Sequence, residues 1–218
     1  MSLLRRRGMY ANGELPAGYK RCEYIEGTGT QFIDLGSIPI GEKSGFRIRL
    51  NITKGTGANA FGGCVPNNRN FAYFGLRDGK SRFFTSNYSP LTATPVANFG
   101  RTLYGTDIEY AYKYDNVRSL FSIQTNGIEI GTSRTFTMPN SSFALFSFKD
   151  ARGIIRSAAE EVAKMKLMLF EVFSGENIQA KLLPCIRLED QSAGMYDIVS
   201  DTFFGNVGTG LFIAGNTV

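Results

Sequence analysis

LLPCIRLEDQSAGMYDIVSDTFFGNVGTGLFIAG, residues 182–215, is the stretch from which the fold of this chain can be argued. Its short apolar runs are separated by clusters of Gly, Asp, Asn and Ser, which is typical of strands joined by tight turns. The pattern predicts, in order, a strand at Leu182–Leu188, a polar turn at Glu189–Ala193, a short strand at Met195–Val199 and a closing strand at Gly210–Ala214.

The Gly-Thr-Gly at Gly208–Gly210 has a near-copy close to the other end of the chain, at Gly27–Thr30. We expect the two ends to meet in one sheet, with Leu211–Ile213 closing the sandwich against Phe32 and Ile33. Asp197 and Asp201 are interpreted as turn and strand-end residues that help this closure.

Composition favours many short strands and excludes several kinds of active site. The 218 residues include 18 Phe, 10 Tyr and 25 Gly, and aromatic residues favour pleated strands while Gly favours turns. The chain contains no His, which excludes a Ser-His-Asp or Cys-His arrangement and a His-containing zinc site. Three Cys without close pair spacing are expected to be reduced and buried.

The clearest alternation lies at Gly45–Thr53, where apolar and polar residues take turns. Phe46, Ile48, Leu50 and Ile52 are predicted to face the core, and Arg47, Arg49 and Asn51 to face outward. Asp78-Gly79 and Asn126-Gly127 each lie between two strand-like runs and predict hairpin turns. Ser89–Asn98 is predicted to be a loop, and Lys164–Phe173 a strand with Met165, Leu167 and Leu169 on one face and Lys166, Met168 and Phe170 on the other.

About a dozen short strands, no long helix and no internal repeat indicate an all-β protein. We predict a two-sheet antiparallel sandwich at residues 15–218, formed as one domain in which the two ends of the chain meet. A basic arm, residues 1–14, precedes it.

Three segments carry a resemblance to a known family: LPAGYKRCEYIEGTGTQFIDLG at 15–36, MKLMLFEVFSGENIQAKLLPC at 165–185 and GMYDIVSDTFFGNVGTGLF at 194–212. They resemble the ends of concanavalin A-like lectin/glucanase (laminin-G-like) domains found in bacteriophage structural proteins and gut-bacterial surface proteins. The resemblance implies a jelly-roll sandwich and brings no catalytic motif.

Glycoside hydrolysis is the enzymatic alternative on such a fold, and the acids do not match it. Retaining members need two carboxylates about 5 Å apart, presented as E-x-D-x-x-E on one strand. Asp107 and Glu109 share a strand face but lack the third acid, while Glu160-Glu161 and Glu189-Asp190 lie in a loop and a turn. We therefore predict that the protein is not an enzyme.

Carbohydrate binding is one functional hypothesis, because sugars are bound by aromatic faces together with planar polar groups. The candidates are Tyr73, Arg77, Tyr88, Tyr110 and Tyr112, with Phe83 and Asn87. The alternative is that these aromatic side chains pack in the core.

A structural role in a bacteriophage particle, as a capsid decoration, head-fibre or tail component, is the leading hypothesis. Arg5, Arg6, Arg7 and Tyr10 in the arm are predicted to anchor the domain to other virion proteins, since Arg binds acidic surfaces through bidentate contacts. The chain shows no signal peptide, which suits assembly in the host bacterial cytoplasm; the alternative location is the bacterial cell surface.

A modest net charge of +5, with its only cluster in the arm, does not favour specific nucleic-acid binding, and no membrane partner is expected. A homo-oligomer and host glycans remain further candidate partners. Asp115, Asn116 and Asp201 are the candidate Ca²⁺ ligands, but no loop has the density of oxygen ligands that Ca²⁺ takes. We expect no metal and no cofactor.

Overall fold

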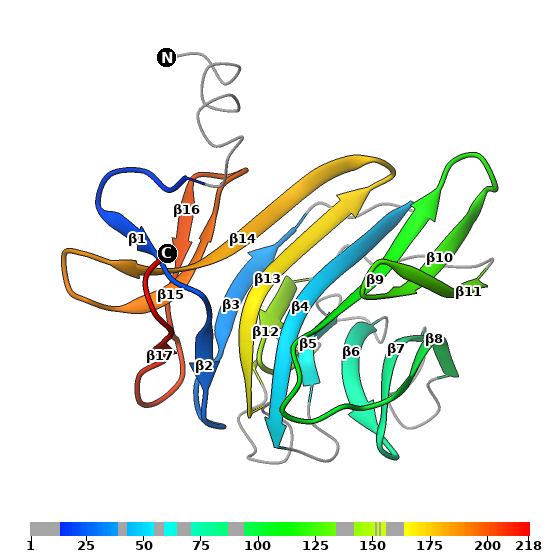
Figure 1. Cartoon of the computed structure of the whole chain (residues 1–218), viewed down its shortest axis with the longest axis horizontal. Coiled ribbons are helices and arrows are strands. Elements are labelled where there is room, and N and C mark those ends of the chain that lie inside the picture. Colours follow the sequence, from blue (N-terminus) through cyan, green and yellow to red (C-terminus); the bar gives the residue numbers. More distant parts are fainter. Residues whose placement is uncertain are drawn as a thin grey trace.

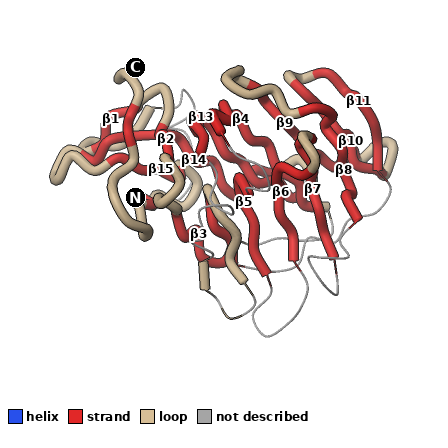
Figure 2. Tube along the Cα trace, turned by 90° about the horizontal axis from the view of Figure 1, so that it is seen from below, coloured by secondary structure: helices blue, strands red, loops and turns tan. Residues whose placement is uncertain are grey.

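The computed structural model describes residues 14–38, 43–54, 59–64, 71–86, 94–133, 142–150, 152, 154–155 and 164–218. These residues form two antiparallel sheets that lie face to face, which confirms the predicted all-β jelly-roll sandwich (Figure 2). Basic arm residues 1–13, including Arg5, Arg6, Arg7 and Tyr10, lie outside the described residues.

The larger sheet has eleven strands within the described residues. They are β1 (Tyr19–Arg21), β2 (Ile25–Gly27), β4 (Ser44–Lys54), β9 (Ile108–Asp115), β10 (Leu120–Thr125), β11 (Ile128–Ser133), β13 (Lys164–Ser174), β14 (Asn177–Arg187), β15 (Ala193–Asp197), β16 (Thr202–Phe204) and β17 (Ile213–Ala214). Their order is β11-β10-β9-β4-β13-β14-β15-β16; β2 also pairs with β13, β17 with β2, and β1 with β14. The long strands β4 and β13 run side by side through the middle of this sheet (Figure 1).

The smaller sheet has six strands in the described part of the chain, in the order β3-β12-β5-β6-β7-β8. They are β3 (Ile33–Ser37), β5 (Asn59–Cys64), β6 (Phe71–Arg77), β7 (Lys80–Ser86), β8 (Thr94–Arg101) and β12 (Ser142–Leu145). The prediction of a loop across Ser89–Asn98 is wrong from Thr94 onward, because β8 occupies that part. The loop was predicted partly because Pro95 is unfavourable in most strands. Proline is tolerated on an edge strand, however, and β8 is an edge strand of this sheet.

The alternation of β4 is confirmed and builds the centre of the core. Phe46, Ile48, Leu50 and Ile52 are each at most 2% exposed. The Phe46 ring makes edge contacts with Phe61 and Phe83 of the opposite sheet at centroid distances of 4.8 Å. Each such buried aromatic ring contributes about 1.5–3 kcal/mol relative to an exposed one, so this seam stabilises the contact between the sheets.

Both predicted hairpin turns are confirmed. Asp78 and Gly79 adopt φ values of 54° and 68° between β6 and β7, and Asn126 and Gly127 adopt 49° and 76° between β10 and β11. Two successive positive φ values match the right-handed twist of the flanking strands, which is why Asp-Gly and Asn-Gly occur here.

The two ends of the chain meet, as predicted, and their Gly-Thr-Gly segments are in contact. Thr209 N–H donates to Thr30 O at 3.1 Å, and the Thr30 hydroxyl donates back to Thr209 O at 3.0 Å. Gly208 is required at this contact, because a Cβ there would lie 2.1 Å from Thr30 O. Val207 N–H extends the contact by donating to Phe32 O at 3.0 Å.

The closing strand is shorter than the predicted Gly210–Ala214 and pairs elsewhere. β17 contains only Ile213 and Ala214, whose partners are Glu26 and Ile25 of β2. Phe212 reaches the core through the Phe146 ring, at a centroid distance of 4.9 Å. The strand β16, which the sequence pattern did not indicate, forms the sheet edge beside β15.

Asp197 is a turn residue at the end of β15, as predicted, and its contacts lie within that turn and with β14. Its carboxylate is 4% exposed and accepts hydrogen bonds from Lys181 N–H, Val199 N–H and the Ser200 hydroxyl. It therefore caps the turn after β15 and ties that turn to β14. Asp201 accepts a short hydrogen bond from the Tyr196 hydroxyl in the same turn.

A β-bulge in β13 overturns the predicted alternation of that strand. Pairing with β4 shifts register between Leu167 and Leu169, so Met168 is the extra residue. Beyond the bulge, Phe170 and Val172 are each 1% exposed in the core, while Leu169 lies on the outer face with Glu171. Before the bulge the odd-numbered residues of β13 face the core, and after it the even-numbered residues do, because a bulge places two residues opposite one on the partner strand.

Candidate functional site

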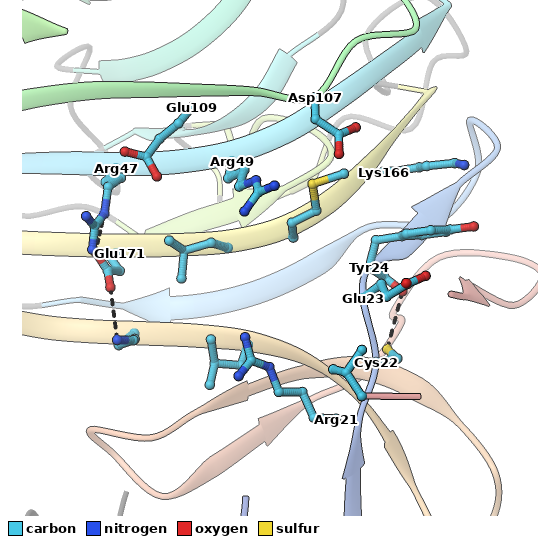
Figure 3. Close-up of a pocket in the computed structure, with 15 residues that line it drawn as sticks. Arg21, Cys22, Glu23, Tyr24, Arg47, Arg49, Asp107, Glu109, Lys166 and Glu171 are labelled. Atoms are coloured by element: carbon cyan, nitrogen blue, oxygen red, sulfur yellow. Dashed lines mark hydrogen bonds and ion pairs between the residues drawn. The ribbon is translucent and has the colours of Figure 1, made fainter. Parts of the chain in front are cut away.

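The outer face of the larger sheet carries a pocket of about 850 Å³. Its floor comes from β4, β9, β13 and β14, and its wall is the segment 21–24, which starts at the last residue of β1 (Figure 3). We call it the outer-face pocket. The side chains used below to describe it are Arg21, Glu23, Tyr24, Arg47, Arg49, Asp107, Glu109, Lys166, Met168, Leu169, Glu171, Lys181 and Leu183.

A buried carboxylate organises the floor. Glu171 is 0% exposed and is paired across the sheet with Arg47 on one side and Lys181 on the other. Arg47 Nε donates to Glu171 Oε2 at 2.7 Å, and its Nη2 lies 2.5 Å from the same oxygen. Lys181 Nζ lies 3.4 Å from Oε1 in an ion pair, although Oε1 accepts no hydrogen bond among the described residues.

This row holds its two cations in place at the pocket surface. The side chains of Arg47 and Lys181 are 33% and 30% exposed, while the carboxylate between them has no exposed area. Removing a carboxylate from water is costly unless charged hydrogen bonds replace its hydration, which the Arg47 guanidinium provides. The row is therefore a preorganised polar surface rather than a set of freely moving side chains.

The wall is fixed by backbone hydrogen bonds to β14 and to the C-terminal segment. Cys22 N–H donates to Pro184 O at 3.0 Å, Glu23 N–H donates to Asn216 O at 2.9 Å, and Gly215 N–H donates to Tyr24 O at 2.8 Å. The half-buried Tyr24 ring is thereby held at the pocket, where Lys166 Nζ lies 4.3 Å from its centroid. The Tyr24 side chain raises the pKa of Lys166, which stays a cation.

Cys22 in this wall and Cys185 of β14 are both buried, as predicted for the cysteines. Burial raises the pKa of Cys22 to about 11 and that of Cys185 to about 12. Because only the thiolate is a nucleophile, neither group is suited to covalent chemistry at neutral pH. The side chain of Cys64 is outside the described part of the structure.

The apolar part of the pocket comes from the bulge in β13. Met168 and Leu169 are consecutive residues, yet both line the pocket. Together with Leu183 of β14 they form an apolar surface beside the charged row. A ligand that has both apolar faces and polar edges matches this lining.

Two of the predicted glycan-binding tyrosines are in the core, which corrects that prediction. Tyr110 and Tyr112 are 1% and 0% exposed and point toward the smaller sheet. Tyr112 stacks on Phe121 at 4.5 Å, and the Tyr110 hydroxyl bonds to the Ser81 hydroxyl at 3.1 Å. Even-numbered residues of β9 face inward, so these rings cannot present a face to a sugar.

The other predicted glycan-binding residues do not form a site among the described residues. Tyr73 is 4% exposed and stacks on Phe84 at 4.7 Å, on the side of the smaller sheet away from the core, and Phe83 is in the core itself. Tyr88 and Asn87, and the side chain of Arg77, lie outside the described part of the structure.

The residues of the outer-face pocket were only partly foreseen. Arg47 and Arg49 were predicted to face outward, and that alternation was the signal that could have located the pocket floor. Glu171 could not be found this way, because strict alternation along β13 places it in the core with Met165 and Leu167.

The candidate Ca²⁺ ligands have other partners. The Asp115 carboxylate accepts from the backbone N–H groups of Val117 and Arg118, and these bonds with the Arg118 side chain lower the pKa of Asp115. Within the described residues, no three His, Cys, Asp or Glu side chains are grouped so that they could hold a metal ion. Nor does that part of the chain include a helix long and apolar enough to cross a membrane.

Comparison with known proteins identifies the fold. No protein-family model matches the sequence, and no curated protein matches it either. The structure is similar to that of a heptameric SAP-like pentraxin from Limulus polyphemus, with a TM-score of 0.55 and 10% identity over 90% of this chain and 94% of the pentraxin chain. It is also similar to the CBM40 module of the Ruminococcus gnavus IT-sialidase, solved with alpha2,3 sialyllactose, with a TM-score of 0.54 and 13% identity over 84% of this chain and 98% of the module.

These similarities define the fold: a lectin-like β-sandwich. More particularly, the chain has the concanavalin A-like, laminin-G-like jelly-roll fold that its terminal segments resemble. At such low identity the likeness concerns the fold, and function has to be argued from the site.

Proposed function

We propose that this protein binds carbohydrate, without catalysis, in the outer-face pocket. The observation that carries the proposal is the Arg47–Glu171–Lys181 row on the pocket floor, next to the apolar surface of Met168 and Leu169. Sugar hydroxyls pair with charged planar groups that are held in fixed positions, and the C–H faces of a sugar ring pack on apolar side chains. A volume of about 850 Å³ is within the range of pockets that take small organic ligands.

The fold supports the same proposal. The Ruminococcus module of the same architecture was solved with a bound oligosaccharide, so a sandwich of this kind can present a sugar-binding surface. The pairing of the acids supports the absence of catalysis: Glu171 is held between two cations, and Asp107 accepts from the Asn51 amide at 2.9 Å. Glycoside hydrolysis uses two carboxyl groups, and these contacts give two of the pocket acids structural partners instead.

A glycan array probed with the wild-type protein tests this proposal, followed by calorimetry on the glycans that bind. We expect binding to at least one glycan class, and a loss of at least tenfold in affinity for Leu169→Glu, which replaces part of the apolar surface of the pocket by a charge. Thr132→Glu adds the same charge at an exposed position of β11 and should bind normally. A protein that binds no glycan, or a Leu169→Glu variant that binds like wild type, would refute the proposal.

A structural role in a bacteriophage particle is a second proposal, supported by the sequence. It depends on the resemblance of the terminal segments and on the basic cluster Arg5–Arg7. It is compatible with sugar binding, because a particle protein can present a lectin-like surface to its host. Mass spectrometry of purified particles from the same source should detect the protein, and its absence from them would end this proposal. Deletion of residues 1–13 should prevent incorporation into particles while the sandwich stays folded.

A further inference from the structure

In the outer-face pocket, more of the acidic than of the basic side chains have partners within the protein. Five cations line it, Arg21, Arg47, Arg49, Lys166 and Lys181, together with four acids, Glu23, Asp107, Glu109 and Glu171. Most of the acids accept hydrogen bonds from other residues of the protein, whereas the side chains of Arg21 and Arg49 make no ion pair or hydrogen bond with another described residue. The difference indicates which sign of charge the pocket can still accept.

Three of the four acids already accept hydrogen bonds. Glu171 is held between Arg47 and Lys181 as described above. Asp107 accepts from the Asn51 amide at 2.9 Å, and Glu23 accepts from the Asn216 amide at 3.2 Å. Their capacity to bind a cationic ligand is reduced accordingly.

The guanidinium groups retain unused donors. Arg47 directs both Nε and Nη2 at a single oxygen of Glu171, so the rest of its fork remains available. Arg49 and Arg21 are exposed, and neither side chain has an ion pair or hydrogen bond with another described residue. Arg49 lies in the centre of the floor, between Glu109 of β9 and Leu169 of β13 (Figure 3).

We infer that the ligand of the outer-face pocket is an acidic saccharide whose carboxylate or sulfate group is bound by Arg49. This inference rests on the proposed function and names its ligand class. A guanidinium binds either group bidentately, with two parallel N–H donors. Arg21 on the wall and Lys166, held over the Tyr24 ring, add positive charge around the anion.

The mixed apolar and polar lining of the pocket favours a saccharide over a small inorganic anion. Met168, Leu169 and Leu183 offer apolar contacts that phosphate or sulfate ions cannot use. The Arg47–Glu171–Lys181 row presents donors within the same pocket, suitable for the hydroxyl groups of the same ring. The acid group and the ring that carries it are thus recognised by different parts of one surface.

Calorimetry with three matched trisaccharides tests this inference: an α-1,4-linked galacturonate, the corresponding neutral galactose trisaccharide, and a sulfated galactose trisaccharide without carboxylate. We expect at least one acidic trisaccharide to bind tenfold or more tightly than the neutral one, and this preference to shrink between 0.05 and 0.5 M salt, as screening requires. Comparison of the two acidic probes distinguishes carboxylate from sulfate.

Arg49→Gln provides the decisive variant, since the residue is exposed and its loss should leave the melting temperature unchanged. It should lower the affinity for the preferred acidic trisaccharide about tenfold and so abolish the preference for the acidic over the neutral probe. Arg101→Gln, at an exposed position on the edge strand β8, is the matched control and should bind like wild type.

The failures of the two proposals are distinguishable. Neutral binding equal to or tighter than acidic binding, or an Arg49→Gln variant that retains the acid preference, would overturn the acidic ligand while sugar binding stands. A wild-type protein that binds none of the three trisaccharides and no glycan on the array would overturn both proposals.

Discussion

Gly208→Ala tests whether the contact between the two chain ends stabilises the sandwich. The added Cβ would lie 2.1 Å from Thr30 O and 2.9 Å from the Phe32 ring. Thr30 O is a backbone atom and the acceptor of the Thr209 N–H, so it cannot move away without breaking that hydrogen bond. The segments around Thr30 and residue 208 must therefore move apart by roughly 1 Å or more before the new Cβ lies at an ordinary van der Waals distance of about 3.4 Å from Thr30 O.

The cost can be worked out from what that separation breaks. Three of the hydrogen bonds that cross the contact are made by Val207 and Thr209, the two neighbours of Gly208: Thr209 to Thr30, the Thr30 hydroxyl to Thr209, and Val207 to Phe32. Each contributes about 0.5–1.5 kcal/mol net. Phe212 is only 6% exposed in the folded protein, and separation of the segments would expose part of its ring. This adds to the loss a fraction of the roughly 1.5–3 kcal/mol that a buried aromatic side chain contributes. Together these predict a loss of about 3–5 kcal/mol and a fall in melting temperature of about 6–20 °C.

Thermal and urea unfolding followed by circular dichroism measure this loss. Gly131→Ala in β11 is the control, because its added Cβ would meet only the end of Ile123, at 3.7 Å, and the variant should melt within about 2 °C of wild type. Thr30→Val, which removes one donor without a clash, should lose about 0.5–1.5 kcal/mol. If Gly208→Ala unfolds like wild type, the ends do not hold the sandwich closed and the reasoning is wrong.

Three further predictions concern the charged row and the buried titratable groups. Glu171→Gln should lower the free energy of unfolding, measured in urea, by about 1–3 kcal/mol. This is less than the loss for a fully buried ion pair, because the side chains of Arg47 and Lys181 are partly exposed and can be solvated by water. An unchanged urea midpoint would contradict the role given to this carboxylate. Cys22 and Cys185 should resist a short alkylation pulse at pH 8 and react only in denaturant, as read by peptide mass spectrometry, because burial raises the pKa of each thiol well above that pH; labelling of the folded protein would show that they are accessible. Stability should fall as pH rises from about 10 to 12, by up to about 1.4 kcal/mol per pH unit for Tyr112, because burial raises its folded-state pKa to about 12 and so favours the protonated form, and Tyr112→Phe should flatten this fall in the urea midpoint.

The local sequence patterns were sufficient for the fold class and for much of its detail. Alternation across Gly45–Thr53 defined the two faces of β4, and Asp78-Gly79 and Asn126-Gly127 marked two hairpins because few other residues accept two positive φ values. The repeated Gly-Thr-Gly correctly indicated that the ends meet. The error at β8 arose because the tolerance of a strand for Pro95 depends on its being an edge strand, which a local pattern does not reveal.

The candidate site was much less predictable. For Tyr110 and Tyr112 both sugar binding and core packing are compatible with the pattern, because in a strand rich in Tyr the sequence does not say which face is buried. The alternation of β9 put both rings in the core and Glu109 in the pocket.

Hydrophobic periodicity and turn residues act over a few positions, so they are enough to predict an antiparallel sandwich with joined ends. The place of the pocket, in contrast, depends on how distant strands pair. The bulge at Met168 reverses the phase of β13 and turns Glu171 outward. The strand order β4-β13-β14 then sets that carboxylate between Arg47 and Lys181, residues far apart in the chain. The physical reason is that a charged side chain acquires fixed partners only through sheet register, and register is a property of the packed sheet.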